Sequence, residues 1–148
     1  MAYGWANLLA GRSGIDTVTR FDASAFACRF AGEVKGFNVE DYIPGKEARH
    51  MDTFIHFGLA ASMQAVRDAG LAVGQALSEE AAERIGCLVG SGIGGLPLIE
   101  RTHQEYSERG PRRITPFFVP ASIINMISGH VSIQFGFTGP NLAIVTAC

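Results

Sequence analysis

The sequence predicts a domain that mixes α-helices and β-strands, because two short apolar strand patterns alternate with two long amphipathic helical patterns. The strand patterns cover residues 85–89 and 142–145, and glycine, proline and small residues bound the second of them. The helical patterns cover residues 51–69 and 122–135, where apolar side chains recur every three or four positions. A chain of 148 residues is long enough for one domain with a hydrophobic core.

The composition is that of a globular protein, and it excludes several classes of function. Hydrophobic residues make up 47% of the chain, and a net charge of −2 gives no reason to expect nucleic acid as a partner. No apolar run is long enough to span a membrane, and the first residues lack the pattern of a signal peptide. The three cysteines, Cys28, Cys87 and Cys148, are scattered without metal-ligand spacing. We therefore expect no metal, no cofactor and no disulfide framework, in a protein of the reducing cytoplasm.

The N-terminal part of the chain is predicted to open with a helix and then to become less regular. Residues 1–11 carry the helical pattern, and Gly11 is a suitable C-terminal cap. Residues 15–21 are predicted to form a loop. Residues 26–34 are predicted to form a strand, with Cys28 inside it as a small core residue.

The pattern over residues 51–69 is the clearest helix in the sequence. Its apolar stripe predicts a face buried in the core, and Gly70 is expected to end the helix in the left-handed conformation. Gly58 and Ala61 are small, so we expect another element to pack closely against the helix there.

A short basic cluster of Lys46, Arg49 and His50 stands directly before this helix. Two interpretations of the cluster remain open. It is either a solvated face of the protein or a docking patch for an acidic partner.

Residues 90–95 match the pattern G-x-G-x-x-G and follow a predicted strand, which is the context of a dinucleotide-binding turn. Two features argue against that function. The helical segment that follows, up to Ser107, is charged and weakly amphipathic. A dinucleotide-binding domain carries an acidic residue at a strand end roughly 20 residues after the turn. In this chain residues 112–116 stand at that position instead. An NAD-binding domain stays as an alternative. The preferred interpretation is a turn that lets backbone approach a ligand or another chain closely.

Residues 116–120 form an apolar run between prolines, shortly after a second basic pair, Arg112 and Arg113. Apolar loops of this kind usually pack against another surface, so we expect a subunit interface here. The helix predicted over residues 122–135 carries small residues beside its apolar stripe, which predicts tight burial. His130 lies on this helix and is interpreted as a core histidine.

The last stretch, residues 139–148, consists of a turn, an apolar run and small residues before Cys148. Residues 142–145 have the pattern of a buried strand. Thr146 and Ala147 are small and leave the next side chain accessible. A thiol at such a strand end is well placed as a nucleophile, because a following helix N-terminus favours the reactive thiolate. A buried structural cysteine is the open alternative.

Several motifs together resemble the β-ketoacyl-[acyl-carrier-protein] synthases. Thr146-Ala147-Cys148 is similar to the start of the active-site signature of that family. The other similar segments are residues 5–11, 13–15, 21–24, 49–52, 68–71, 90–95, 110–113, 116–120 and 125–126. The run over residues 116–120 favours the type II branch of the family over type I.

The resemblance implies a thiolase-like fold, in which two related α/β halves form a layered sandwich within a homodimer. Residues 1–148 would be an incomplete N-terminal half, covering part of the first α/β half only. The fold's first strand and the helix after the cysteine would be missing. By the same resemblance, Cys148 takes an acyl chain from acyl carrier protein as a thioester, and its backbone N–H serves in the oxyanion hole.

The resemblance also assigns two sets of binding residues. Ile93 matches a position that gates the acyl pocket, and Phe118 and Val119 match positions that line the pocket of the partner subunit. The basic surface that receives acyl- or malonyl-loaded acyl carrier protein is matched by Lys46, Arg49, Arg112 and Arg113.

The implied reaction is a decarboxylating Claisen condensation of the acyl-cysteine with malonyl-acyl carrier protein in fatty acid elongation. The family supports loss of CO2 and stabilises the enolate with two histidines, a lysine and a gating phenylalanine from its second half. The histidines of this chain do not match those positions: His50, His56, His103 and His130. We therefore expect this chain alone to be inactive in condensation. A non-catalytic partner subunit of a condensing enzyme is a further alternative.

Overall fold

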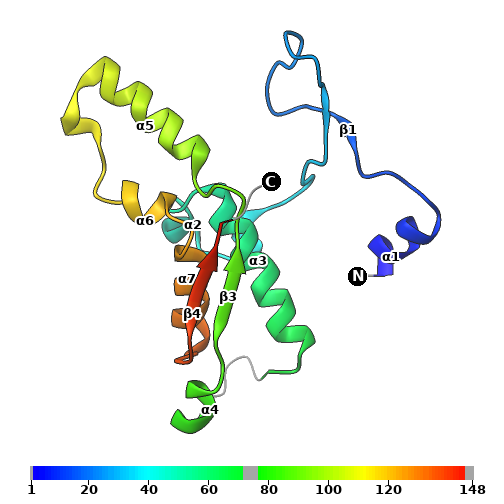
Figure 1. Cartoon of the computed structure of the whole chain (residues 1–148), viewed down its shortest axis with the longest axis vertical. Helices are drawn as coiled ribbons and strands as arrows, with labels where there is room; N and C mark the ends of the chain where they lie inside the picture. The colour runs from blue at the N-terminus through cyan, green and yellow to red at the C-terminus, as the bar shows by residue number, and fades with distance from the viewer. Residues whose placement is uncertain (1, 72–76, 146–148) are drawn as a thin grey trace. The chain divides into compact units, whose positions relative to one another are not determined.

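The computed structural model of the chain describes residues 2–71 and 77–145 (Figure 1). The chain divides into two compact units, residues 1–37 and 38–148, and each unit is described by itself. The second unit mixes helices with parallel strands, which confirms the predicted α/β class.

The first unit begins with helix α1 (Ala2–Leu9), as predicted, and Gly11 follows it with a φ of +65°. Strand β1 (Asp16–Thr17) pairs antiparallel with β2 (Phe30–Ala31). The strand predicted over residues 26–34 is therefore too long. Strand geometry is confined to the residues that have a hydrogen-bonded partner across the hairpin.

The prediction that Cys28 is a core residue is wrong, because its side chain is exposed. Cys28 lies in the loop that joins β1 to β2, and its Sγ lies 3.6 Å from the carbonyl oxygen of Phe30. The apolar residues of this loop pack on one another instead of on a core. The rings of Phe21 and Phe26 meet edge to face, with centroids 5.7 Å apart.

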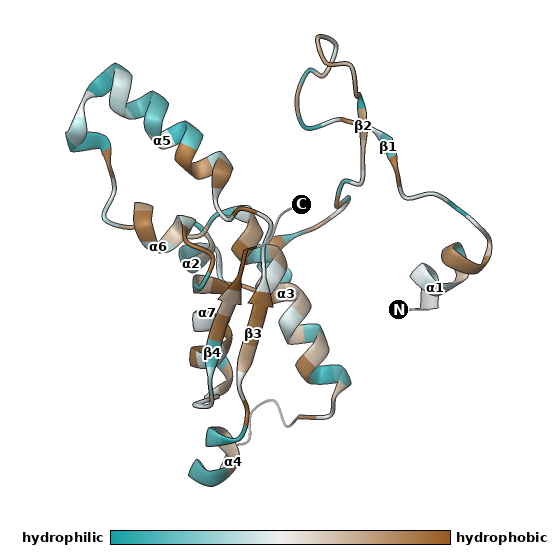
Figure 2. Ribbon diagram, viewed as in Figure 1, coloured by the Kyte–Doolittle hydropathy of each residue, from teal (hydrophilic) through white to brown (hydrophobic). Residues whose placement is uncertain are grey.

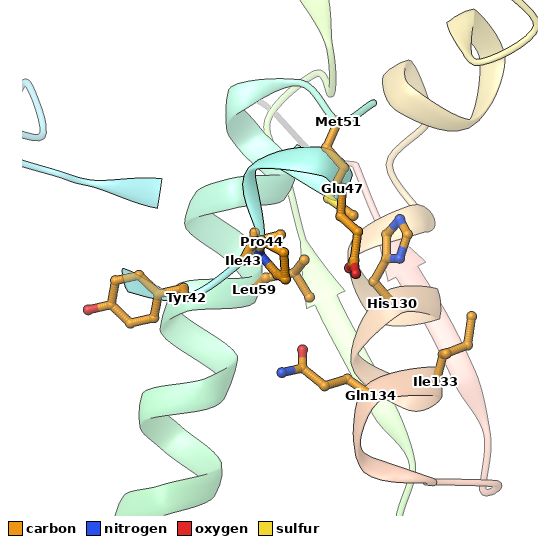
Figure 3. A pocket seen from close by; sticks show the side chains of 9 residues that line it. All are labelled: Tyr42, Ile43, Pro44, Glu47, Met51, Leu59, His130, Ile133 and Gln134. Carbon is orange, nitrogen blue, oxygen red and sulfur yellow. The ribbon is translucent and has the colours of Figure 1, made fainter. Parts of the chain in front are cut away.

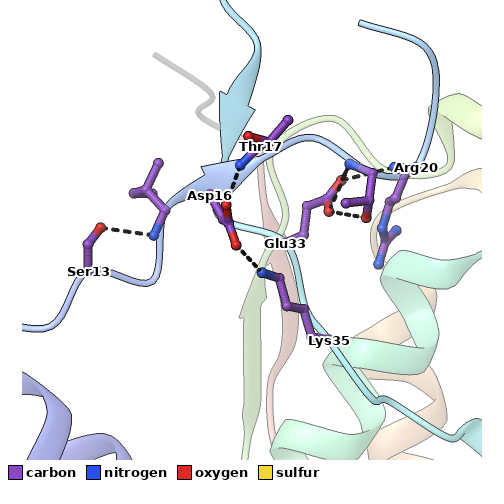
Figure 4. A network of polar contacts seen from close by, with 8 residues as sticks. Ser13, Asp16, Thr17, Arg20, Glu33 and Lys35 are labelled. Carbon is purple, nitrogen blue, oxygen red and sulfur yellow. Dashed lines mark hydrogen bonds and ion pairs between the residues drawn. The ribbon is translucent and has the colours of Figure 1, made fainter.

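Polar contacts hold the two sides of this hairpin together (Figure 4). The carboxylate of Glu33 accepts hydrogen bonds from the backbone N–H of Thr19 at 3.1 Å and from its hydroxyl at 2.7 Å. The ammonium group of Lys35 forms an ion pair with Asp16 at 2.9 Å. The hydrogen bond from Lys35 lowers the pKa of Asp16, and the hydrogen bonds from Thr19 lower the pKa of Glu33.

The second unit contains most of the regular structure. In chain order its described elements are η1 (Val39–Asp41), α2 (Gly45–Ala48), α3 (Thr53–Asp68), α4 (Glu79–Glu83), β3 (Cys87–Gly90), α5 (Leu96–Arg109), η2 (Pro111–Arg113), α6 (Phe118–Ser122), α7 (Met126–Phe135) and β4 (Asn141–Ile144). The elements η1 and η2 are single 3-10 turns.

Strands β3 and β4 form a parallel two-stranded sheet, in which Leu88 lies opposite Leu142. Helix α7 packs against both strands and against α3, so the core lies between this helix pair and the sheet (Figure 1). Figure 2 shows that the two strands are largely hydrophobic. The buried residues of this core are Ile43, Ala48, Ile55, Leu59, Val66, Cys87, Ile127, Val131 and Phe137.

Helix α3 follows the prediction closely, and its ends explain why. The side chain of Asp52 caps its first turn, and Gly70 follows the C-cap residue Ala69 with a φ of +66°. The predicted close approach occurs at Gly58, where an added Cβ would lie 2.5 Å from Cγ2 of Ile127. Ala61, for which the same was expected, is exposed.

The helix predicted over residues 122–135 is split into two. Residues 118–122 form α6, Ile123 has an extended backbone with a ψ of 141°, and α7 begins at Met126. The apolar run between the prolines is therefore helical from Phe118 onward, and Phe117 before it lies in a turn. The expected tight burial holds at Ser128, which is fully buried and donates its hydroxyl to the carbonyl of Asn125 at 3.0 Å.

The strand predicted over residues 142–145 forms as β4, but the prediction that it is buried is wrong. Leu142 is 60% exposed, and its neighbour Leu88 on β3 is 63% exposed. Alternate residues of a strand point to opposite faces, and Cys87 and Val89 point toward the core. Apolar residues on both faces are typical of parallel strands that are covered on both sides. In the described part of the chain, helices cover only one.

Candidate functional site

The Gly-rich turn after β3 packs directly on the end of α6. The backbone N–H of Gly95 donates to the carbonyl of Ser122 at 2.9 Å. An added Cβ on Gly95 would lie 2.7 Å from the Cα of Ser122, and one on Gly94 would lie 2.8 Å from its carbonyl oxygen. The turn therefore does make a close backbone approach, but to α6 of this chain and not to the ligand or second chain that was expected. Gly94 also has a φ of +101°, which other residues rarely adopt.

Asp52 fixes the start of α5 beside this turn. Its buried carboxylate accepts a hydrogen bond from the N–H of Leu98 at 2.8 Å and another from the N–H of Thr53. In a dinucleotide-binding domain the pyrophosphate occupies this helix N-terminus. Here the carboxylate of Asp52 already occupies it, which argues against the NAD-binding alternative.

The last residues of β4 arrive at the same edge of the sheet as the Gly-rich turn. The two strands are parallel, so their carboxyl ends meet at one edge, and the N–H of Ser91 donates to the carbonyl of Ile144 at 3.1 Å. Cys148 itself lies outside the described residues. Ligands of open parallel sheets bind at this edge, which makes it the candidate site.

The residues predicted to line an acyl pocket lie around the junction of the turn and α6. Ile93 precedes the two glycines of the contact and is 61% exposed. Phe118 and Val119 begin α6, one turn before Ser122, and Val119 is 56% exposed. The structure thus brings their backbone segments together and leaves apolar side chains exposed beside them.

The basic residues form two separate groups along α5. Lys46 and Arg49 lie in and directly after α2, and both are exposed. Arg112 and Arg113 are exposed on η2, which follows the last turn of α5. Figure 1 shows α5 leading away from the sheet toward η2, so the two groups lie at its opposite ends.

A shallow pocket of about 120 Å³ lies at the first of these groups, and it contains a cation that the sequence did not single out. Arg101 of α5 lines it together with Arg49, Thr115 and Phe117. The ring of His50 stacks on Phe117, with centroids 3.9 Å apart and an angle of 26° between the planes. Arg101 stands in the charged, weakly amphipathic helical segment before Ser107 and belongs to none of the motifs found in the sequence.

His130 is half-buried and faces Glu47 across a second pocket of about 240 Å³ (Figure 3). Tyr42, Pro44 and Gln134 also line this pocket. Burial lowers the pKa of His130, and the negative charge of Glu47 opposes that shift in part. The histidine predicted to lie in the core is thus at its edge.

A model of the family described as "Beta-ketoacyl synthase, N-terminal domain" matches residues 3–148. The chain belongs to the β-ketoacyl synthase family. The 3-oxoacyl-[acyl-carrier-protein] synthase 2 of Vibrio cholerae is 56% identical to it over 144 residues, which are 97% of this chain and 34% of that relative. The chain therefore spans about a third of the length of the curated relatives it matches.

Solved ketosynthases share the fold of this β-ketoacyl synthase chain. The ishigamide ketosynthase/chain length factor superposes with a TM-score of 0.74 and 25% identity, over 99% of this chain and 36% of that one. A chain from the structure of a type II PKS acyl-carrier protein in complex with its ketosynthase superposes with a TM-score of 0.65 and 23% identity, over 78% of this chain and 31% of that one. The predicted thiolase-like fold is thereby confirmed.

No helix within residues 2–71 and 77–145 is both long and apolar enough to cross a membrane. Within them, no group of three or more His, Cys, Asp or Glu side chains is placed to hold a metal ion.

Proposed function

We propose that this chain is the nucleophile-bearing part of a cytoplasmic 3-oxoacyl-[acyl-carrier-protein] synthase 2, with residues 1–148 as an incomplete N-terminal half of the synthase domain. One observation carries the proposal: the family match runs through residues 3–148 and so includes the terminal Thr-Ala-Cys motif. The 56% identity to a synthase 2 over almost the whole chain supports the same function.

The chemistry assigned to Cys148 is the first half of the reaction. Its thiolate attacks the thioester carbonyl of an acyl group carried by acyl carrier protein. The tetrahedral oxyanion is stabilised by backbone N–H groups, that of Cys148 among them. Collapse of this intermediate expels the thiolate of the carrier, which takes up a proton, and leaves the acyl group on Cys148 as a thioester.

The second half of the reaction needs groups that this chain does not supply. An enolate forms when malonyl-acyl carrier protein loses CO2, and it must be stabilised before it attacks the acyl-cysteine. Two histidines here have structural contacts instead. His56 Nε2 lies 2.9 Å from the carbonyl oxygen of Ala48, and His50 stacks on Phe117. We therefore assign condensation to the longer protein and only acyl transfer to this chain.

The exposed side chains near the Gly-rich turn are proposed to bind the acyl chain and a second subunit. Ile93 gates the acyl pocket, while Phe118 and Val119 of one subunit line the pocket of the other in a homodimer. The exposure of Ile93 and Val119 supports this, because apolar side chains left in water favour contact with a ligand or a partner. Acyl carrier protein docks on the basic groups at Lys46 and Arg49 and at Arg112 and Arg113.

The proposal is tested by the intact mass of this chain after incubation with acyl-loaded acyl carrier protein. The expected result is a gain of one acyl group that is absent in Cys148→Ala. Cys28→Ser is the matched control, because the Cys28 thiol is free and exposed and could take up acyl groups without catalysis. The gain should persist in Cys28→Ser. Addition of malonyl-acyl carrier protein should yield no 3-oxoacyl product.

Either of two results would contradict the assignment. A mass gain that persists in Cys148→Ala would place the acyl group on another residue. No gain in the unmutated, folded chain would mean that this part of the enzyme does not activate its thiol.

A further inference from the structure

The pocket lined by Arg49, Arg101, Thr115 and Phe117 has the chemistry of a site for a single oxyanion. Its two guanidinium groups come from different elements, α5 and the end of α2. A guanidinium group presents its N–H donors in a planar fork, which matches the two oxygens of a carboxylate. A volume of about 120 Å³ suits one such group and is too small for a nucleotide.

No carboxylate neutralises these two cations in the described part of the chain. Neither guanidinium group forms an ion pair there, and no acidic residue lines the pocket. Asp52 stands close to Arg49 in the sequence, but its carboxylate already accepts hydrogen bonds from the N–H groups of Thr53 and Leu98. Two arginines thus line one pocket, and neither has an acidic partner in the described part of the chain.

The remaining walls of the pocket add a donor and fix its shape. The hydroxyl oxygen of Thr115 accepts the N–H of Phe117 at 3.3 Å, which leaves its own hydrogen free to donate. The stacked ring of His50 holds Phe117 in place. Side chains held by packing lose less entropy when a ligand binds, which favours binding.

We propose that this pocket receives one carboxylate side chain of the docked acyl carrier protein, and that Arg101 is a specificity-determining residue for that partner. The inference rests on the proposed function, because it takes the acidic carrier as the occupant. A free anion would bind weakly here, since both arginines are exposed and dissolved salt screens them. A carboxylate on a docked protein is held at the site by the other contacts of that protein.

The separation of the two basic groups makes the inference testable by coupling. Arg49 and Arg101 would share one carboxylate, so removal of either one weakens the contact of the other. Arg112 lies on η2, beyond the far end of α5, and would contact a different part of the carrier. Its effect should therefore add independently to that of Arg49.

The experiment measures the dissociation constant of this chain for fluorescently labelled apo acyl carrier protein, which carries no thioester and reports docking alone. We expect Arg101→Ala to weaken binding about 3- to 10-fold, and Arg101→Lys to weaken it less. In the double variant Arg49→Ala/Arg101→Ala the dissociation constant should rise by less than the product of the two single increases. In Arg49→Ala/Arg112→Ala it should rise by the full product.

Arg84→Ala is the matched control, because Arg84 lies before β3 and thus at the opposite edge of the sheet from the Gly-rich turn. It should leave the dissociation constant unchanged. Unchanged binding in Arg101→Ala, or effects of Arg49 and Arg101 that simply multiply, would overturn this inference and leave the proposed function standing. Inorganic phosphate that binds with dependence on Arg101, while the carrier does not, would overturn it as well.

Failure of the proposed function gives a different result. In that case the unmutated chain would neither bind the carrier nor gain an acyl group at Cys148, and the inference would fall with it.

Discussion

The buried carboxylate of Asp52 joins the starts of two helices. It caps α3 through the N–H of Thr53 and holds α5 through the N–H of Leu98. We expect Asp52→Ala to lower the free energy of unfolding by about 2–4 kcal/mol, because it removes a helix cap and leaves a second buried donor unpaired. Asp52→Asn keeps one acceptor oxygen and should cost about 1 kcal/mol. Urea unfolding followed by circular dichroism measures both. Equal losses in the two variants would contradict the bridging role.

Two glycines in neighbouring helices should respond in opposite ways to the same substitution. An added Cβ on Gly58 would meet Ile127 at 2.5 Å, whereas one on Gly129 would meet nothing within 4 Å. Alanine is more favourable than glycine inside a helix by about 1 kcal/mol, but overpacking a core costs about 1–3 kcal/mol of stability. Gly129→Ala should therefore stabilise the chain and Gly58→Ala should destabilise it, as thermal unfolding would measure.

The Gly58 prediction has its own internal control. The cost of Gly58→Ala should disappear when Ile127→Ala is present, because the clashing side chain is then gone. A Gly58→Ala variant that is destabilised equally in both backgrounds would mean that the contact with Ile127 is not the cause.

At the scale of elements, His130 of α7 and Glu47 of α2 face each other across a pocket and make stability depend on pH (Figure 3). Burial lowers the pKa of His130 below its ordinary value of 6.5, and Glu47 opposes that shift. Well above pH 6.5 the imidazole is neutral in both the folded and the unfolded chain. As the pH falls below that value, the unfolded chain takes up the proton first, so the free energy of unfolding decreases. The loss ends below the lowered folded pKa.

The variant His130→Gln should reduce this loss, and Glu47→Gln should increase it, because the opposing negative charge is then absent. Urea unfolding at about pH 7.5 and pH 5.5 gives the difference in the free energy of unfolding for each variant and for the unmutated chain. An unchanged pH dependence in His130→Gln would exclude this residue as the source.

The elements that the sequence predicted well are those whose signals are local. The apolar stripe of α3 lies between a capping aspartate and a glycine with positive φ, so its bounds follow from the sequence. The break between α6 and α7 has no such signal. It arises where Ile123 turns to an extended backbone, and the apolar run of isoleucines continues across it. The strand expected around Cys28 failed for a similar reason, because strand pairing depends on a partner distant in sequence.

The candidate site was predictable only in part. The proposed nucleophile, the Gly-rich turn and three of the basic positions stand in motifs similar to those of a known family. Arg101 has no such motif, and only the fold brings it to Arg49 and Phe117. The engagement of the α5 N-terminus by Asp52 was likewise hidden, because the two lie far apart in sequence.

At the scale of the whole molecule, the two-stranded sheet has one face packed on helices and one face exposed. Leu88 and Leu142 lie opposite each other on the exposed face, while Val89 points toward the core. Parallel strands are normally covered on both sides, so this face should drive the isolated chain to self-associate. Threonine suits a strand exposed to water, so Leu88→Thr/Leu142→Thr should reduce association without unfolding the chain.

Val89→Thr is the matched control, because it places the same side chain on the same strand but toward the core. It should lower the free energy of unfolding by about 1–3 kcal/mol, since it buries a hydroxyl where a methyl group was packed. Sedimentation velocity would measure the association, and urea unfolding the stability. If Leu88→Thr/Leu142→Thr lowered the free energy of unfolding as much as Val89→Thr, the two leucines would be packed inside the folded chain and the prediction would be wrong. Association that persisted in the double variant would locate the contact elsewhere, and the exposed apolar residues of α6 would then be the next surface to replace.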